Sequence, residues 1–178
     1  GRAASSPWPI AYRLPEPDRI ATLRKLGVRA FAPLAYPHKP DMARWLTGWL
    51  AGFVADVPEA VGTATLYPEP DVAGYLGAAV EAGVRAVKVH VQVGAFDPRD
   101  ALLRPAWGLL AEAGVPAVVH CGHGPRPGAY TGLDVFAEVL AEHPRLTAVI
   151  AHAGMPDYVA ALELVHRFPR VHLDTTMV

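Results

Sequence analysis

The sequence has a single cysteine, no long apolar run and no excess of charge of either sign, and each absence excludes a class of protein. One thiol, that of Cys121, cannot form an internal disulfide framework and is typical of a reducing cytoplasm. A membrane span needs ~20 continuous apolar residues, and no window of the chain approaches that length. Residues 1–10 lack the apolar core of a signal peptide. We therefore expect a cytoplasmic protein that is not embedded in a membrane.

The charges are nearly balanced, with 16 Lys and Arg against 17 Asp and Glu and a formal net charge of -1. No basic stripe interleaved with aromatic residues is present, so we do not expect nucleic acid as a partner. With 52% hydrophobic and 19% charged residues, the composition is that of a folded globular protein. At 178 residues the chain can form one good core and is too short for two ordinary domains. We expect a small-molecule partner, and we leave open whether the protein forms a homo-oligomer.

One pattern recurs along almost the whole chain: a short β-branched run, a turn, an amphipathic stretch and then Gly or Pro. The runs have the length of buried strands and are Val28–Pro33, Val61–Leu66, Val84–Val91, Val115–Cys121, Leu146–His152 and Val171–Asp174. The predicted helices are Glu16–Leu26, Asp41–Ala55, Asp71–Ala82 and Asp100–Ala113. Gly27, Gly83 and Gly114 follow three of these helices, at the position where a helix favours a left-handed residue.

Strands and helices that alternate through roughly six units predict right-handed crossovers and a parallel sheet of the α/β class. An open doubly wound sheet and a closed (β/α) barrel both satisfy this order. A dinucleotide-binding sheet would carry a Gly-rich loop after its first strand, but after Phe31 the chain reads APLAYPHKP, without a glycine. We therefore predict a (β/α)8 TIM barrel. A complete barrel usually takes ~250 residues, so we expect residues 1–178 to form a single incomplete barrel domain that covers roughly strands 2 to 7.

The reacting groups of such barrels lie at the carboxyl ends of the strands and in the loops that follow. Three successive predicted strands end in histidine, in VKVHVQVG, AVVHCGHG and AVIAHAGM, and the next ends in aspartate, in VHLDTT. These residues are His90, His120, His152 and Asp174. A lone strand histidine is more often structural, but three at the same depth of successive strands indicate a functional cluster.

His120 and His152 form the sharpest pair, because each ends a run of small and β-branched residues and precedes a Gly-containing loop. Neutral imidazole is a natural ligand of zinc and similar ions. Catalytic zinc sites use about three protein ligands and leave one position open for a water molecule, whose pKa the ion lowers. A second histidine that does not bind the ion can hold or deprotonate this water. The pair therefore predicts metal-dependent chemistry.

The segments GVPAVVHCGHGP, HPRLTAVIAHAGMPDY and RVHLDTTM resemble the fifth, sixth and seventh strands of the amidohydrolase-related (amidohydrolase 2) family of metal-dependent TIM-barrel hydrolases and decarboxylases. The resemblance extends upstream through GVRAVKVHVQVGAFDPRD and covers most of the chain. It implies a divalent metal, zinc above all, with His120 as a direct ligand and His152 as the catalytic acid/base or water-positioning group. The family's His-x-His pair of strand one and its aspartate of strand eight are absent from these 178 residues, and we expect them in further segments of the protein.

The resemblance implies a hydrolase, or a non-oxidative decarboxylase, that acts through a metal-bound water on a small, carboxylate-bearing molecule. Lys88 and His90 are two positions apart and share one face of their strand, so both could bind this substrate. His123 and Arg126 lie in the loop GHGPRPG at the expected entrance, where a guanidinium group suits a carboxylate. Asp174 could orient a histidine or line the pocket, or it could have a structural role. We assign structural roles to His38, His143, His166 and His172.

Two other functions stay open. A metal-free Schiff-base lyase would use Lys88 as its nucleophile, because desolvation inside a barrel depresses the pKa of a lysine. Trapping with borohydride in the presence of substrate would reveal it. A non-catalytic barrel with a decayed site would lack the strand-one histidines in the full protein.

Overall fold

The computed structural model describes residues 14–176 and residue 178, and it divides the chain into two compact units, Gly1–Phe31 and Ala32–Val178. Residues 1–10, in which we expect no signal peptide, lie outside the described part. Among its described residues the first unit has one helix, α1 (Glu16–Lys25), which ends one residue before the predicted boundary. Acidic residues in the first turn of α1 and basic residues in its last turn match the helix dipole.

The second unit contains a parallel sheet of five strands in the order β1-β2-β3-β4-β5. The strands are β1 (Thr63–Thr65), β2 (Ala86–His90), β3 (Ala117–His120), β4 (Ala148–Ile150) and β5 (Val171–Leu173). From β2 to β5, each strand pairs in parallel with the strand before it in the chain. A doubly wound sheet would instead reverse its order at a switch point. The unreversed order is that of consecutive strands in a (β/α) barrel, as predicted.

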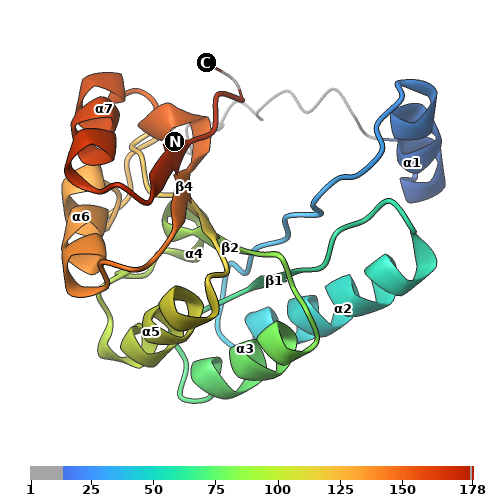
Figure 1. Ribbon diagram of the computed structural model, residues 1–178, viewed down its shortest axis with the longest axis horizontal. Coiled ribbons are helices and arrows are strands. Elements are labelled where there is room, and N and C mark those ends of the chain that lie inside the picture. Colours follow the sequence, from blue (N-terminus) through green and yellow to red (C-terminus); the bar gives the residue numbers. More distant parts are fainter. Residues whose placement is uncertain (1–13, 177) are drawn as a thin grey trace, which may run out of the picture. The chain divides into compact units, whose positions relative to one another are not determined.

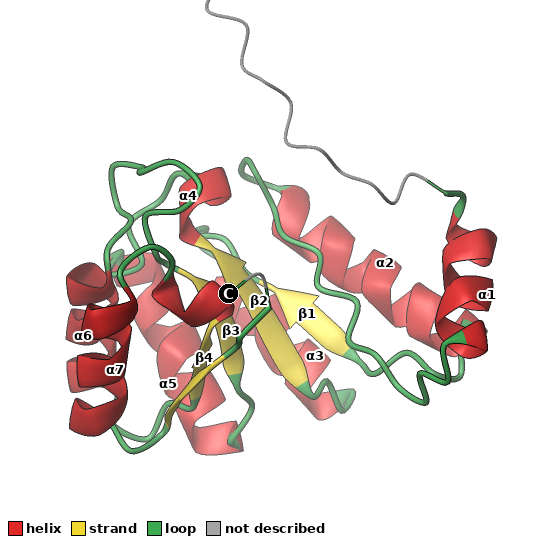
Figure 2. Cartoon of the chain, turned by 90° about the horizontal axis from the view of Figure 1, so that it is seen from above, coloured by secondary structure: helices red, strands yellow, loops and turns green. Residues whose placement is uncertain are grey.

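Helices connect the strands, and α3, α5, α6 and α7 cover one face of the sheet (Figure 1, Figure 2). The helices of this unit are α2 (Met42–Asp56), α3 (Val72–Glu81), α5 (Arg104–Ala113), α6 (Leu133–Glu142) and α7 (Tyr158–Arg167), with short turns α4 (Val91–Gly94), η1 (Ala101–Leu103) and η2 (Ala151–Gly154). α2 packs along β1, where the backbone N–H of Thr65 donates to the hydroxyl of Thr47 at 3.3 Å. None of the helices that the structure describes is both long and apolar enough to cross a bilayer.

The two faces of the sheet differ in chemistry because successive side chains of a strand point to opposite sides. The face under the helices is aliphatic and fully buried, and it includes Val87, Val89, Ala117, Val119, Ala148 and Ile150. In a barrel the face turned away from the helices is the lumen. We call it the lumenal face, and the strand register assigns to it Thr65, Lys88, His90, Val118, His120, Val149 and His172. The polar side chains of the strands are therefore concentrated on one side.

The predicted strand Val28–Pro33 is wrong. Residues 28–30 have no regular structure, and Phe31 forms only an isolated bridge. All of these residues are exposed or half-buried, so none of them belongs to the buried core. Pro33 also lacks the N–H that a strand inside a sheet must donate. An apolar run without burial is insufficient to form a strand here.

The predicted strand Leu146–His152 is longer than the observed strand β4, which ends at Ile150. His152 and Ala153 lie in η2 and have left-handed backbone angles, with φ of 55° and 48°. Residues with a β-carbon avoid this region at a cost of roughly 1–2 kcal/mol each. The turn therefore needs support from its neighbours, and it places His152 beyond the strand instead of on it.

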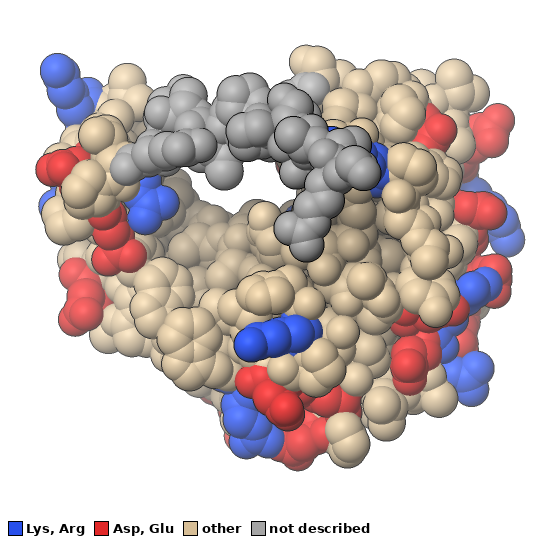
Figure 3. Space-filling model, turned by 180° about the vertical axis from the view of Figure 1, so that it is seen from behind, with Lys and Arg blue, Asp and Glu red and all other residues tan. Residues whose placement is uncertain are grey.

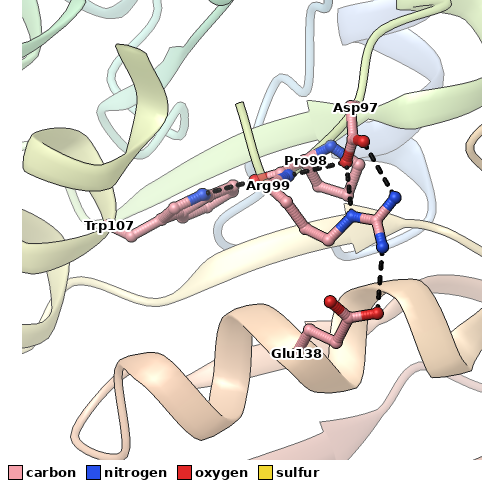
Figure 4. A network of polar contacts seen from close by, with 5 residues as sticks. All are labelled: Asp97, Pro98, Arg99, Trp107 and Glu138. Atoms are coloured by element: carbon pink, nitrogen blue, oxygen red, sulfur yellow. Dashed lines mark hydrogen bonds and ion pairs between the residues drawn. The ribbon is translucent and has the colours of Figure 1, made fainter. Parts of the chain in front are cut away.

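The loop between β2 and α5 is fastened to the helix layer by two kinds of polar contact (Figure 4). Trp107 of α5 is only 1% exposed, and its indole N–H donates to the carbonyl of Pro98 at 2.9 Å. Arg99 bridges Asp97 and Glu138 of α6, with N to O distances of 2.9 Å. Exposed ion pairs of this type contribute little to stability. We infer that the buried Trp107 is the main anchor of this loop.

The charged side chains are mixed on the face of the molecule drawn in Figure 3, where Lys and Arg stand among Asp and Glu. Among the described residues visible in this view, no patch of a single sign forms. This distribution agrees with the formal net charge of -1.

Replacing Trp107 should test the importance of the helix layer. Trp107→Ala removes the contact with Phe136 of α6, whose ring centroid lies 6.0 Å away, and leaves a cavity. We expect a loss of about 3–5 kcal/mol in the free energy of unfolding, measured by denaturant titration. The matched variant Trp45→Ala changes a side chain that is 62% exposed and should stay within about 0.5 kcal/mol of the wild type. Equal losses in the two variants would contradict this account of the core.

Candidate functional site

Three histidines form a row at the carboxyl end of the sheet. β2 ends at His90 and β3 at His120, and the strand register pairs these two residues. Their ring centroids are 4.0 Å apart, and their planes differ by 14°. His152, in η2 directly after β4, meets His120 edge to face, with centroids 5.2 Å apart. We call His90, His120 and His152 the histidine row.

Hydrogen bonds determine which ring nitrogen of His120 and of His152 carries the proton. Nε2 of His120 lies 2.8 Å from the carbonyl oxygen of Gly124, and Nδ1 of His152 lies 2.9 Å from that of Thr176. A carbonyl oxygen only accepts, so each of these nitrogens donates an N–H. In the neutral rings the lone pairs are then on Nδ1 of His120 and on Nε2 of His152. Burial lowers the pKa of His120 and favours its neutral form.

His90 has the opposite hydrogen-bonding role. Its Nδ1 accepts the backbone N–H of Val93 at 3.4 Å. Burial, together with smaller contributions from the nearby His120 and Lys88, lowers the pKa of His90 to about 3. A neutral imidazole whose Nδ1 accepts carries its proton on Nε2. His90 is therefore a hydrogen-bond donor that offers no lone pair to a metal ion.

Lys88 lies one layer below the histidine row on the lumenal face and is only 6% exposed. Burial lowers its pKa from 10.5 to about 8, although Cys121 and Asp174 act in the opposite direction. Within the described residues its ammonium group makes no hydrogen bond or ion pair. A buried cation is unfavourable, and an anion that reaches it gains a strong interaction. Lys88 is thus suited to hold an anionic group.

Asp174 acts on the turn that carries His152. Its carboxylate accepts the backbone N–H of Thr176 at 2.8 Å and the hydroxyl of the same residue at 2.5 Å. Its backbone carbonyl accepts the N–H of Ala153 at 2.7 Å. Burial alone would raise the pKa of Asp174, but the hydrogen bonds from Thr176 and the interactions with His152 together lower it. These contacts support the left-handed backbone of the turn.

His123 and Arg126 lie in the β3–α6 loop, residues 121–132, which follows the strand of His120. Nδ1 of His123 is 2.6 Å from Oδ2 of Asp157, next to the start of α7, and both side chains are partly exposed. The side chain of Arg126 is exposed, while its backbone carbonyl accepts from the amide of Gln92. In the described part of the chain, neither side chain forms a hydrogen bond, ion pair or ring contact with the histidine row.

Two residues near the row were missed by the sequence analysis or given another role. The ring of Tyr36 lies 4.5 Å from that of His90 at an interplanar angle of 50°. Tyr36 is in the APLAYPHKP segment, and its position there, after a predicted strand, is the signal that could have pointed to it. His172, which we assigned to the structure, is exposed on the lumenal face. Both can contribute to the walls of a binding site.

The residues of the row fit part of a metal site and not a whole one. Nδ1 of His120 is free, and Gly124 holds the other ring nitrogen as carbonyl groups commonly do for histidine ligands. Nδ1 of His90 accepts from Val93, so in this structure the neutral ring carries its proton on Nε2 and presents a donor to the site. Across residues 14–176, no group of three or more His, Cys, Asp or Glu side chains is placed to hold an ion. A catalytic site with about three protein ligands therefore needs donors from outside the described residues.

Solved structures share this fold over most of the chain. A TIM-barrel protein of Bordetella bronchiseptica, described as uncharacterized, has a TM-score of 0.75 at 16% identity, and the match covers 90% of this chain and 59% of that one. The 5-carboxyvanillate decarboxylase LigW of Sphingomonas paucimobilis has a TM-score of 0.65 at 14% identity, with coverages of 89% and 64%. Dihydroorotase of Campylobacter jejuni has a TM-score of 0.54 at 14% identity, with coverages of 85% and 48%. The chain thus has the TIM-barrel fold and spans less than two thirds of these proteins.

The chain contains a parallel barrel segment with a row of histidines at its strand ends. The family model described as Amidohydrolase matches residues 3–178, and the chain belongs to this family. Members are typically enzymes, among them hydrolases and decarboxylases, and the family generally uses divalent metals. No curated protein sequence matches the chain. The family and fold that we expected from the sequence are confirmed.

The depressed pKa of Lys88 predicts a pH-dependent stability. Below pH 8 the buried ammonium is charged in the folded state, which destabilises the fold, whereas above pH 10.5 the amine is neutral in both states. Lys88→Met, which keeps most of the volume without the charge, should therefore be more stable than the wild type near pH 7, by up to about 3 kcal/mol. The difference should shrink as the pH rises from 8 to 10.5. Unfolding by denaturant at several pH values measures it, and a difference that stays constant over this range would contradict burial as its cause.

Proposed function

We propose that the protein is a metal-dependent hydrolase of the amidohydrolase type, or a non-oxidative decarboxylase built on the same site. Its substrate is a small, carboxylate-bearing molecule, and its metal is a divalent ion, zinc above all. The observation that carries the proposal is the pairing of two imidazole lone pairs, on His120 and His152, above the buried cation of Lys88. The family supports it because its members generally combine a divalent metal with this fold.

In this proposal His120 holds the ion through Nδ1, and further ligands come from outside the described residues. A bound divalent ion would supply Lewis acidity, which polarises a carbonyl group and lowers the pKa of water. The chain's own contribution is the orientation of His120 by Gly124, because the Nε2–H bond leaves only Nδ1 for the ion. The cytoplasmic location that we propose agrees with the buried, reduced thiol of Cys121.

His152 is the proposed acid/base group. Its Nε2 can accept a proton from an attacking water molecule in hydrolysis and return it to the leaving group. In decarboxylation the bond between carbon and carboxylate breaks, the electron pair stays on the carbon, and a protonated His152 can deliver the replacing proton. The Nδ1–H bond to Thr176 keeps the ring in one orientation during either transfer.

Lys88 and His90 are the proposed substrate-binding groups. The ammonium of Lys88 attracts the carboxylate of the substrate, and Nε2–H of His90 donates to a neighbouring oxygen. Tyr36, beside His90, forms an aromatic wall for the bound molecule. We assign His123 and Arg126 to the entrance of the site and Asp174 to the support of the His152 turn, where the carbonyl of Asp174 accepts from Ala153.

Mutation of the two central histidines tests this division of roles. His120→Ala should remove both metal and activity, since it deletes a ligand of an ion that has few ligands. His152→Ala should keep most of the metal and lower turnover by ~10²–10⁴-fold, because general acid–base groups contribute this much. The measurements are elemental analysis of the full-length protein and turnover of a panel of small carboxylates. Equal loss of metal in both variants would make His152 a ligand and overturn the assignment.

A Schiff-base lyase is the second candidate, favoured by one observation: burial lowers the pKa of Lys88 to about 8, so part of the amine is free at neutral pH. Borohydride with substrate would then link substrate covalently to Lys88, as mass spectrometry would show, and activity would survive chelators. We expect no such adduct. Lys88→Arg is the matched variant: it keeps the charge and should retain part of the substrate affinity if Lys88 is an anchor, but no activity if Lys88 is a nucleophile.

A further inference from the structure

The loops that follow β3 and β4 are locked together by their backbones. A β-carbon on Gly122 would fall 2.7 Å from backbone atoms of Gly154 and Met155, so glycine is required for this close approach. The N–H of Gly124 donates to the carbonyl of Met155 at 2.8 Å. The β3–α6 loop therefore rests directly on the segment that follows His152.

Gly124 also holds His120. Its carbonyl accepts the Nε2–H of His120 at 2.8 Å, while its N–H is bound to Met155. One glycine thus connects His120 on one side with the backbone after His152 on the other. The orientation of His120 depends on the position of this residue.

A side-chain bond closes the same two loops at their exposed end. His123 is flanked by Gly122 and Gly124, so it supplies the one side chain of this Gly-His-Gly segment. Its Nδ1 donates to Oδ2 of Asp157 at 2.6 Å. Asp157 is the residue before α7, and its own N–H donates to the carbonyl of Gly154 at 3.0 Å. The bond therefore joins the middle of one loop to a well-supported point on the other.

We propose that His123 and Asp157 form a clasp that positions His120 for metal binding by holding Gly124 in place. His123 is a positioning residue in this proposal, because it acts on His120 through Gly124 and does not touch the reacting atoms. Without the clasp, the Gly-His-Gly segment keeps only its backbone contacts with Gly154 and Met155, and the carbonyl of Gly124 is free to tilt away from Nε2 of His120. His120 then populates both neutral tautomers, and its Nδ1 is no longer held ready for an ion. The metal part of this inference rests on the proposed function.

The test uses the full-length protein with four changes: His123→Ala, Asp157→Ala, the double variant and His123→Asn. In the metal-free protein, ¹⁵N-histidine NMR reports the tautomer of His120. We expect a single Nε2–H form in the wild type and a mixture in each alanine variant. Titration with Co²⁺ should show affinity reduced about 10- to 100-fold in each, as for other groups that orient a metal ligand. The Co²⁺ affinity of the double variant should be no lower than that of the weaker-binding single variant, because the two residues act as one unit.

Two comparisons separate positioning from a general loss of structure. His123→Asn places an amide N–H near the position of Nδ1, so it should restore both the single tautomer and the Co²⁺ affinity. His166→Ala removes an exposed histidine from α7, the helix that Asp157 precedes, and should match the wild type in both readouts.

The clasp proposal is overturned if the alanine variants keep a single His120 tautomer and wild-type Co²⁺ affinity. It is also overturned if the fold-losses of Co²⁺ affinity in the two single variants multiply in the double variant. A wild-type protein that binds no Co²⁺ would refute the proposed function and not the clasp. The tautomer readout still decides the clasp in that case, because a mixed signal in His123→Ala supports it and an unchanged signal rejects it.

Discussion

In a parallel sheet covered by helices on one face, a shift of the pairing by one residue would turn every side chain to the other side. Here such a shift would bring Lys88 and His90 under the helices and Val87 and Val89 into the lumen. The aliphatic layer below α3, α5 and α6 therefore sets the register, because its burial is the main favourable term of folding. The pairing of His90 with His120 follows from that register. The site is a consequence of the packing on the opposite face.

The surroundings of Lys88 and His90 on the lumenal face disfavour the charged forms of these side chains. Lys88 and His90 both have pKa values below their ordinary range, and burial is the first cause in each case. The same low-polarity surroundings strengthen any interaction that these groups make with a ligand. Titratable groups shifted by burial and clustered on one surface are typical of functional sites. The stability lost at the lumenal face is offset by the fully buried aliphatic face behind it.

The loops then decide what each histidine can do. His120 and His152 are both imidazoles, but Gly124 binds Nε2 of one ring and Thr176 binds Nδ1 of the other. The left-handed turn at His152 is supported from β5, through the bond between Ala153 and the carbonyl of Asp174. Neighbouring strands and their loops thus support each other's side chains around the row.

Local sequence patterns determined the order of strands and helices and the position of the histidine row. The alternation of β-branched runs with amphipathic stretches was sufficient to predict the parallel α/β order, because both periodicities arise within a few residues. The convergence of His90, His120 and His152 followed from the rule that parallel strands end at one edge. The run Val28–Pro33 failed as a strand because none of its residues is fully buried, and burial is not a local property. The contact of Tyr36 with His90, and the choice of ring nitrogen in His120 and His152, were decided only by the tertiary structure. Their partners are set by the paths of whole loops, which the spacing of residues in the sequence does not encode.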